Sequence, residues 1–146
     1  MNAMPPTTRR ARLLVASAFA ILLAVHPLCA WAQEIKVTLA GNQEIPPVTT
    51  SASGSGTLTV SPDRTLTGSV TIAGMVVTVA HIHEAAAGAN GPIVVPLTRT
   101  ADNVWSVPSG ARLTEAQYDS FKAGNLYFNM HSAAYKGGEI RGQIKP

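Results

Sequence analysis

The sequence predicts an all-β domain, an antiparallel β-sandwich or Greek-key barrel of about seven to eight strands with one short helix. Three observations lead to this fold class. Apolar and polar residues alternate with a period of two along much of the chain. Glycine and proline recur between the alternating segments, and no regular succession of strands and helices indicates a parallel sheet. Threonine fills many polar positions, where a β-branched side chain suits the exposed face of a strand.

Each alternating segment is predicted to be a strand. In the first, Ile35, Val37 and Leu39 share one face, and Lys36 and Thr38 share the other. The residues that follow, Glu44–Ser55, are rich in proline, serine and threonine and predict an extended loop or edge segment. The predicted strands are Ile35–Leu39, Thr57–Val60, Thr65–Ile72, Met75–His83, Ile93–Leu97, Asn103–Val107, Asn125–His131 and Glu139–Lys145.

One segment has the signals of a helix instead. Thr114 and Gln117 have the spacing of a capping box, in which each side chain bonds the backbone N–H of the other residue. Gly124 stands where a helix commonly ends. These signals predict a helix over Glu115–Ala123.

The first 32 of the 146 residues have the pattern of a secretory signal. Arg9, Arg10 and Arg12 precede an uncharged, mostly apolar run that is too short to span a bilayer, which needs about 20 residues. Ala30 and Ala32 provide a small-x-small cleavage motif. We therefore expect Met1–Ala32 to be removed and residues 33–146 to form a single periplasmic or secreted domain without a membrane span. The arginine pair leaves both general secretion and twin-arginine export open.

The leader also accounts for the basic character of the whole chain, which has a formal net charge of +3. All eight acidic residues lie beyond residue 32, together with eight of the eleven lysines and arginines, so the expected mature domain is neutral. A neutral domain provides no electrostatic reason to expect a nucleic-acid partner. The single cysteine, Cys29, lies in the leader, so no disulfide is expected in the mature domain.

The chemistry of the mature domain is concentrated in three histidines. His81 and His83 are two residues apart on a predicted strand, so both side chains leave the same face. His131 lies on another strand, and if the three converge they form a metal site typical of copper or zinc. Their nitrogens should then lie within about 4–5 Å of one another, because each would bind the ion at about 2.0–2.1 Å. The alternative is that each histidine is simply a hydrogen-bonded side chain.

A polar face is predicted beside His131. Leu126, Phe128 and Met130 alternate with polar residues, so we expect His131 to point away from the core. If this strand pairs with the last one, a polar outer surface is shared by His131, Asn129, Glu139 and Arg141. We expect Glu139 and Arg141 to form an ion pair that orders the sheet. The alternative is that Asn129, Glu139 and Arg141 support the metal ligands or guide a small anion.

Five segments of the chain resemble, in order, the successive motifs of the chordin-type (CHRD) domain. The resemblance implies a secreted or periplasmic β-rich domain and says little about chemistry. The segments are LAGNQEIPP at Leu39–Pro47, AHIH at Ala80–His83, NGPIV at Asn90–Val94, NLYFNMH at Asn125–His131 and GEIRGQ at Gly138–Gln143.

The histidine segments are also similar in order to the copper-site segments of copper/zinc superoxide dismutase. This similarity implies that His81, His83 and His131 are copper ligands, and that Arg141 corresponds to an anion-guiding arginine. Ile93 stands where that family has its metal-bridging histidine, and the zinc ligands and disulfide cysteines have no counterpart. These departures argue against a zinc-bridged dismutase site and leave a three-histidine copper site without zinc as the site that the similarity allows.

Three functional hypotheses follow. The first is an exported protein that binds a metal ion through the three histidines, with copper preferred and zinc as the alternative. The second is a metal-free structural or interaction module of the cell envelope that binds a protein or glycan partner. The third, with the least support, is a redox enzyme similar to superoxide dismutase. The sequence provides no catalytic residue and no motif for an organic cofactor. Whether the protein is an enzyme therefore stays open, and a protein without enzymatic activity is favoured.

Overall fold

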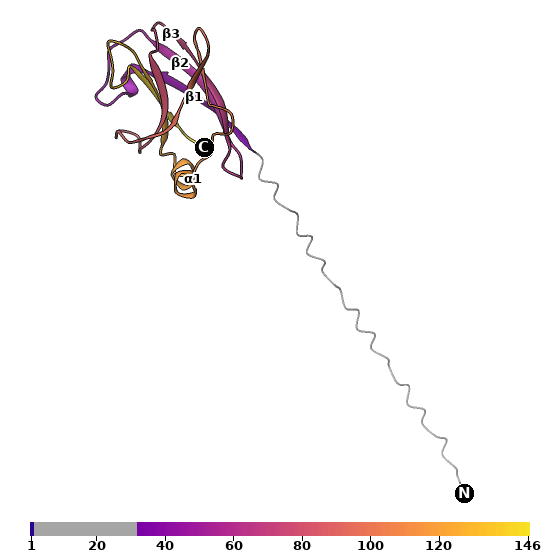
Figure 1. The fold of residues 1–146 in the computed structure, drawn as a ribbon. Helices are drawn as coiled ribbons and strands as arrows, with labels where there is room; N and C mark the ends of the chain where they lie inside the picture. Colours follow the sequence, from indigo (N-terminus) through magenta and orange to yellow (C-terminus); the bar gives the residue numbers. More distant parts are fainter. Residues whose placement is uncertain (2–31) are drawn as a thin grey trace.

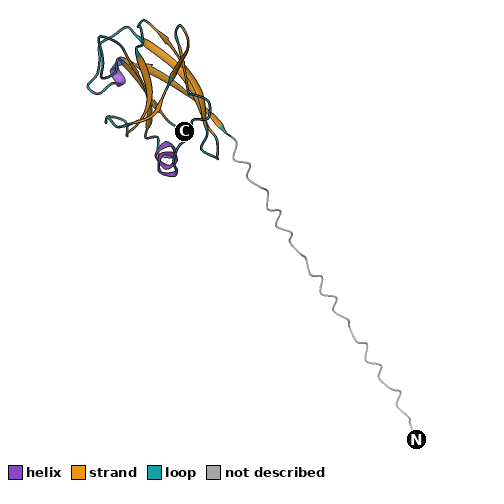
Figure 2. Cartoon of the chain, viewed as in Figure 1, coloured by secondary structure: helices purple, strands orange, loops and turns teal. Residues whose placement is uncertain are grey.

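The computed structural model describes residue 1 and residues 32–146, so residues 2–31 of the predicted leader lie outside the described part. Nine antiparallel strands, one α-helix and one short 3₁₀ helix make up this part of the chain (Figures 1 and 2). They are β1 (Gln33–Ala40), η1 (Gly41–Gln43), β2 (Ser53–Val60), β3 (Leu66–Ala73), β4 (Val79–Glu84), β5 (Ile93–Pro96), β6 (Thr98–Ala101), β7 (Val104–Ser106), α1 (Glu115–Lys122), β8 (Leu126–His131) and β9 (Ile140–Ile144).

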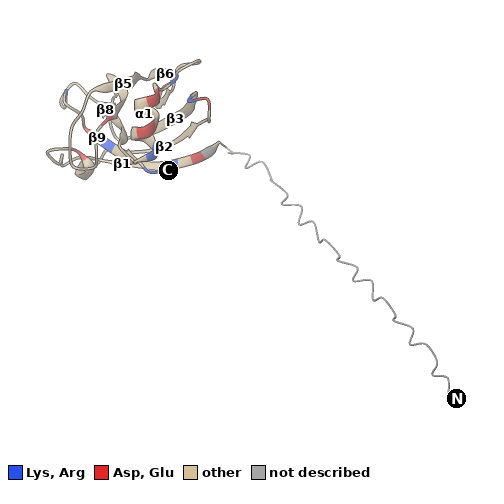
Figure 3. Ribbon diagram, turned by 90° about the horizontal axis from the view of Figure 1, so that it is seen from below, with Lys and Arg blue, Asp and Glu red and all other residues tan. Residues whose placement is uncertain are grey.

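The strands form one sheet that curls into a nearly closed barrel, and the view from below shows them arranged around a ring with β5 beside β6 (Figure 3). Their order is β5-β4-β8-β9-β1-β2-β3-β7-β6, so β5 and β6 are the two edges of the sheet. Only Leu97 separates these two strands in the chain, and its N–H donates to the carbonyl of Ala80 on β4 at 2.9 Å. The two edges are therefore held near each other. The predicted all-β class with one short helix is confirmed, with nine strands in place of seven to eight.

Three strand predictions need correction. Strand β6 was not predicted, because all four of its residues are exposed and no apolar alternation marks it. Strand β4 begins at Val79 rather than Met75, because its neighbour β8 ends at His131, the register partner of Val79. Strand β2 begins at Ser53, within the segment predicted as an extended loop or edge segment, and it lies between β1 and β3 rather than at an edge. Its Gly56 lies so close to β3 that a Cβ atom there would be 2.9 Å from Cγ2 of Val70.

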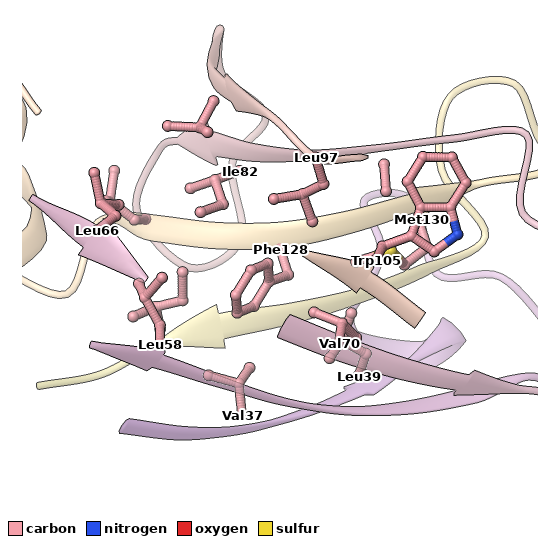
Figure 4. Close-up of a cluster of buried hydrophobic side chains, with 14 of the residues drawn as sticks. Val37, Leu39, Leu58, Leu66, Val70, Ile82, Leu97, Trp105, Phe128 and Met130 are labelled. Carbon is pink, nitrogen blue, oxygen red and sulfur yellow. The ribbon is translucent and has the colours of Figure 1, made fainter. Parts of the chain in front are cut away.

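The core fills the space between facing strands. Leu39 on β1, Leu58 on β2, Ile82 on β4 and Phe128 on β8 are each 0% exposed, and Figure 4 shows these and other apolar side chains packed together. Each fully buried side chain of this kind stabilises the fold by about 1.5–3 kcal/mol relative to an exposed one. With no disulfide in the described residues, the barrel depends on this packing.

The helix forms as its sequence predicts. Both hydrogen bonds of the capping box are present between Thr114 and Gln117, at 3.2 and 2.9 Å. The helix ends at Lys122, one residue before the predicted end, with Ala123 as its C-cap. Its buried Phe121 attaches it to the barrel core.

Candidate functional site

The three histidines of the described residues come together on the side of the sheet that faces away from the core. His81 and His83 project from β4 between the buried residues Ala80 and Ile82. In the adjacent β8, His131 is paired with Val79, one step along the same face from His81. One ring nitrogen from each histidine lies within 4.8 Å of the others. The convergence required for a common metal ion is therefore present.

Two of the rings are fixed by backbone carbonyls. Nδ1 of His83 lies 2.9 Å from the carbonyl oxygen of Gly91, and Nδ1 of His131 lies 2.9 Å from that of Lys136. A carbonyl only accepts, so each Nδ1 carries the proton and each Nε2 keeps its lone pair. Nε2 of His83 is buried and has no hydrogen-bond partner. This is the arrangement that metal-binding histidines commonly have, with the second nitrogen bonded to a carbonyl.

The third ring, His81, completes the group from the more open side. Its Nδ1 lies 3.1 Å from Nε2 of His131. Two nitrogens bound to one ion at about 2.0–2.1 Å lie roughly 2.9–3.4 Å apart, for bond angles between a right angle and the tetrahedral value. Nδ1 of His81 and Nε2 of His83 and of His131 are therefore the atoms that could bind a shared ion.

The surroundings keep two of these rings neutral. Burial lowers the pKa of His81, and the neighbouring His131 and His83 lower it further. Burial also lowers the pKa of His83, while its hydrogen bond to Gly91 acts in the opposite direction. A neutral imidazole is the form that binds a metal. His81 and His83 are therefore favoured in the neutral form that a metal ion requires.

Comparison with known families shows to which family the chain is related. The family model of the CHRD domain matches residues 35–144, about three quarters of the sequence. The chain belongs to the CHRD-domain family. No significant match is found among curated proteins or among solved structures. Within residue 1 and residues 32–146, no helix combines the length and the apolar character needed to cross a membrane.

The polar face of this CHRD domain is a buried layer, contrary to the predicted outer surface. Strands β8 and β9 do pair, with Asn129 opposite Arg141, so the predicted residues share a face. However, His131, Asn129, Glu139 and Arg141 are only 7%, 3%, 7% and 1% exposed. The loops on either side of these strands cover the four side chains. Period-two alternation predicts the face of the strand on which a residue lies, but it does not predict whether a distant loop covers that face.

The three predicted supporting residues each bond a segment of this covering layer. Asn129 donates from Nδ2 to Oε2 of Glu44 at 3.2 Å, and Glu139 accepts from the hydroxyl of Thr50 at 2.7 Å. Arg141 donates to the carbonyls of Ala86 and Ala89, at 3.3 and 2.8 Å. These bonds place all three residues as anchors of the loops of the CHRD domain. The predicted pairing of Glu139 with Arg141 is replaced by these loop contacts.

Two further residues, one at the site and one in the buried polar layer, were not assigned a role from the sequence. The Tyr127 ring stacks on His83, with centroids 5.1 Å apart, and its hydroxyl accepts from the N–H of Gly91 at 3.2 Å. Glu44 is buried beside Asn129, and this burial raises its pKa to about 7. The sequence could have identified Tyr127, because it lies on the same strand face as His131. It could not have identified Glu44, because that residue lies in a loop without periodicity.

Proposed function

We propose that this CHRD-domain protein is an exported metal-binding protein that holds one copper ion through His81, His83 and His131. The observation that carries the proposal is the convergence of three ring nitrogens within 4.8 Å. The carbonyls of Gly91 and Lys136 add support, because they fix the protons of two rings on the nitrogens that face away from the group. Three histidines with independent structural roles would have no reason to converge and to orient their rings in this way.

Copper is preferred over zinc on chemical grounds. Imidazole nitrogen suits both ions, but divalent copper binds a given nitrogen site more tightly than zinc does. The similarity of the histidine segments to those of copper/zinc superoxide dismutase favours the same ion. Zinc is the alternative occupant.

The leader supports a role outside the cytoplasm. Its basic start, apolar core and Ala30–Ala32 motif are typical of a cleaved secretory signal. A domain that binds copper in the periplasm or outside the cell could store the ion, deliver it or protect against its excess. When bound, copper would supply a Lewis-acidic and redox-active centre, and the three histidines would hold it in place.

The decisive experiment is a copper titration of the purified protein. We expect about one equivalent of Cu(II) to bind, with hyperfine structure from several nitrogens in the electron paramagnetic resonance spectrum. The triple variant His81→Ala/His83→Ala/His131→Ala should lose this binding. Arg112→Ala, at an exposed position on another part of the barrel, is the control and should retain it.

Stoichiometric copper binding by the triple variant would exclude these histidines as the site. If the unaltered protein binds neither copper nor zinc, the interpretation as a metal-free envelope interaction module takes its place. Cross-linking in the envelope would then identify the protein or glycan partner.

A further inference from the structure

A stack of three side chains connects the candidate metal site with a buried cation. The rings of His83 and Tyr127 are nearly parallel, with an interplanar angle of 12°. The central guanidinium carbon of Arg141 lies 3.5 Å from the centroid of the Tyr127 ring. Because β8 lies between β4 and β9 in the sheet, the imidazole and the guanidinium are on opposite sides of the tyrosine. The stack therefore runs from the site to Arg141 across three neighbouring strands.

The positive charge in this stack is enclosed by protein. Arg141 is 1% exposed and Tyr127 is 2% exposed. Burial lowers the pKa of Arg141, but an arginine side chain remains charged in proteins. Charges in the protein interior interact more strongly than charges in water, and salt screens them less. The guanidinium charge therefore acts on an ion bound by the histidines.

Little negative charge opposes it. Among the described residues, the group of converging ligand atoms contains three imidazoles and no carboxylate. Glu44 is the acid that acts on Arg141, and its own pKa of about 7 leaves it partly neutral at neutral pH. Glu139 is also buried on this face, but its carboxylate bonds Thr50 rather than Arg141. The positive charge of Arg141 is therefore only partly balanced near the site.

We propose that Arg141 makes the three-histidine site favour a monovalent ion, Cu(I), over the divalent ions Cu(II) and Zn(II). The inference rests on the proposed copper-binding function and adds the charge state of the ion. Repulsion from a fixed positive charge grows in proportion to the charge of the ion, so a divalent ion is penalised more. At an effective dielectric constant of about 20 and a separation of roughly 10 Å, each additional unit of charge weakens binding by about tenfold. Three ligands also leave Cu(II) short of the tetragonal coordination that it prefers.

The test measures the ratio of the affinities of the protein for Cu(I) and for Cu(II). Dissociation constants for Cu(I) and Cu(II) are measured separately, each against a competing chelator of known affinity, with ascorbate and exclusion of oxygen for Cu(I). In Arg141→Gln, which removes the charge and keeps a hydrogen-bond donor, we expect the preference for Cu(I) to fall by about tenfold. Arg141→Lys keeps the charge and should retain the preference. Arg112→Gln, an exposed site elsewhere on the barrel, is the distant control.

Each outcome either supports the inference or overturns it. An unchanged ratio in Arg141→Gln, or an equal loss of both affinities, overturns the inference, because a purely structural role weakens both ions alike. If Arg141→Gln does not fold by circular dichroism, Glu44→Gln at pH 8.5 provides the test. Loss of that carboxylate should raise the preference for Cu(I), and an unchanged ratio overturns the inference. Failure of the unaltered protein to bind copper would instead overturn the proposed function.

Discussion

Glu44 is a carboxyl group whose surroundings favour its neutral form. It is 3% exposed, and its Oε1 atom has no hydrogen-bond partner among the described residues. The neighbouring Asn129 also has an unpaired buried oxygen, Oδ1, while its Nδ2 donates to Oε2 of Glu44. An ionised carboxylate can only accept hydrogen bonds, whereas a protonated one has a hydroxyl to donate. Protonation of Glu44 therefore relieves an excess of acceptors in this buried layer.

This environment predicts that stability falls as the pH rises from about 4.5 to 7. The pKa of Glu44 is raised to about 7 in the folded protein, from 4.5 for the ordinary group. The folded state therefore binds more protons than the unfolded state in this window, and its advantage is complete only below it. We expect a loss of about 1–3 kcal/mol in the free energy of unfolding across the window.

Urea unfolding of the unaltered protein and of Glu44→Gln at several pH values measures this effect. The glutamine cannot ionise, so the difference between the two proteins isolates Glu44 from the histidines. The lowered pKa values of His81 and His83 act in the opposite direction, since they cost stability as the pH falls below about 6.5. A pH-independent difference between the two proteins would contradict the prediction.

At the scale of elements, the loop of residues 85–91 forms one wall of the candidate site. Its Gly91 carbonyl accepts from His83, and a Cβ atom at this position would overlap the carbonyl oxygen of Glu84. We expect Gly91→Ala to displace the loop and to weaken copper binding by about 10–100-fold, as loss of an outer hydrogen bond to a metal ligand commonly does. Gly137→Ala, where a Cβ atom meets nothing within 4 Å, should bind copper normally. Equal copper affinity in the two variants, measured by competition titration, would argue against this role of the loop.

Helix α1 depends on its N-terminal cap. The Thr114 hydroxyl accepts from the N–H of Gln117, and this bond satisfies one of the free donors at the helix start. We expect Thr114→Ala to lower the free energy of unfolding by about 1 kcal/mol, and Thr114→Ser to have a smaller effect because it keeps the acceptor. Urea unfolding of the two variants measures the difference. Identical stabilities would show that the hydroxyl does not matter.

At the scale of the whole molecule, a metal held by β4 and β8 would stabilise the folded barrel. Only the folded state brings His81 and His131 together, so ion binding shifts the folding equilibrium. At a free copper concentration one hundred times the dissociation constant, we expect a gain of about 2.7 kcal/mol and a rise in Tm of roughly 10 °C. Thermal melts with copper and with a chelator measure this shift. The triple histidine variant should show none.

The sequence predicted most of the fold because local signals and tertiary packing agree. In β1, Ile35, Val37 and Leu39 alternate with polar residues, and all three are buried as expected. The capping box of α1 is likewise a local motif that needs no distant partner. Prediction was wrong where the deciding contact was remote, as at Ser53–Ser55, which form the start of β2 because they pair with β1 and β3.

The sequence by itself determined the all-β class, the pairing of His81 and His83 on one strand face, and the face on which His131 lies. Only the tertiary structure decided that the three rings converge, that loop carbonyls fix two of them, and that the polar face is covered. The physical reason is the range of the interactions. Alternation and spacing are properties of neighbouring residues, whereas convergence and burial depend on the register of β4 against β8 and on the loops that close over them.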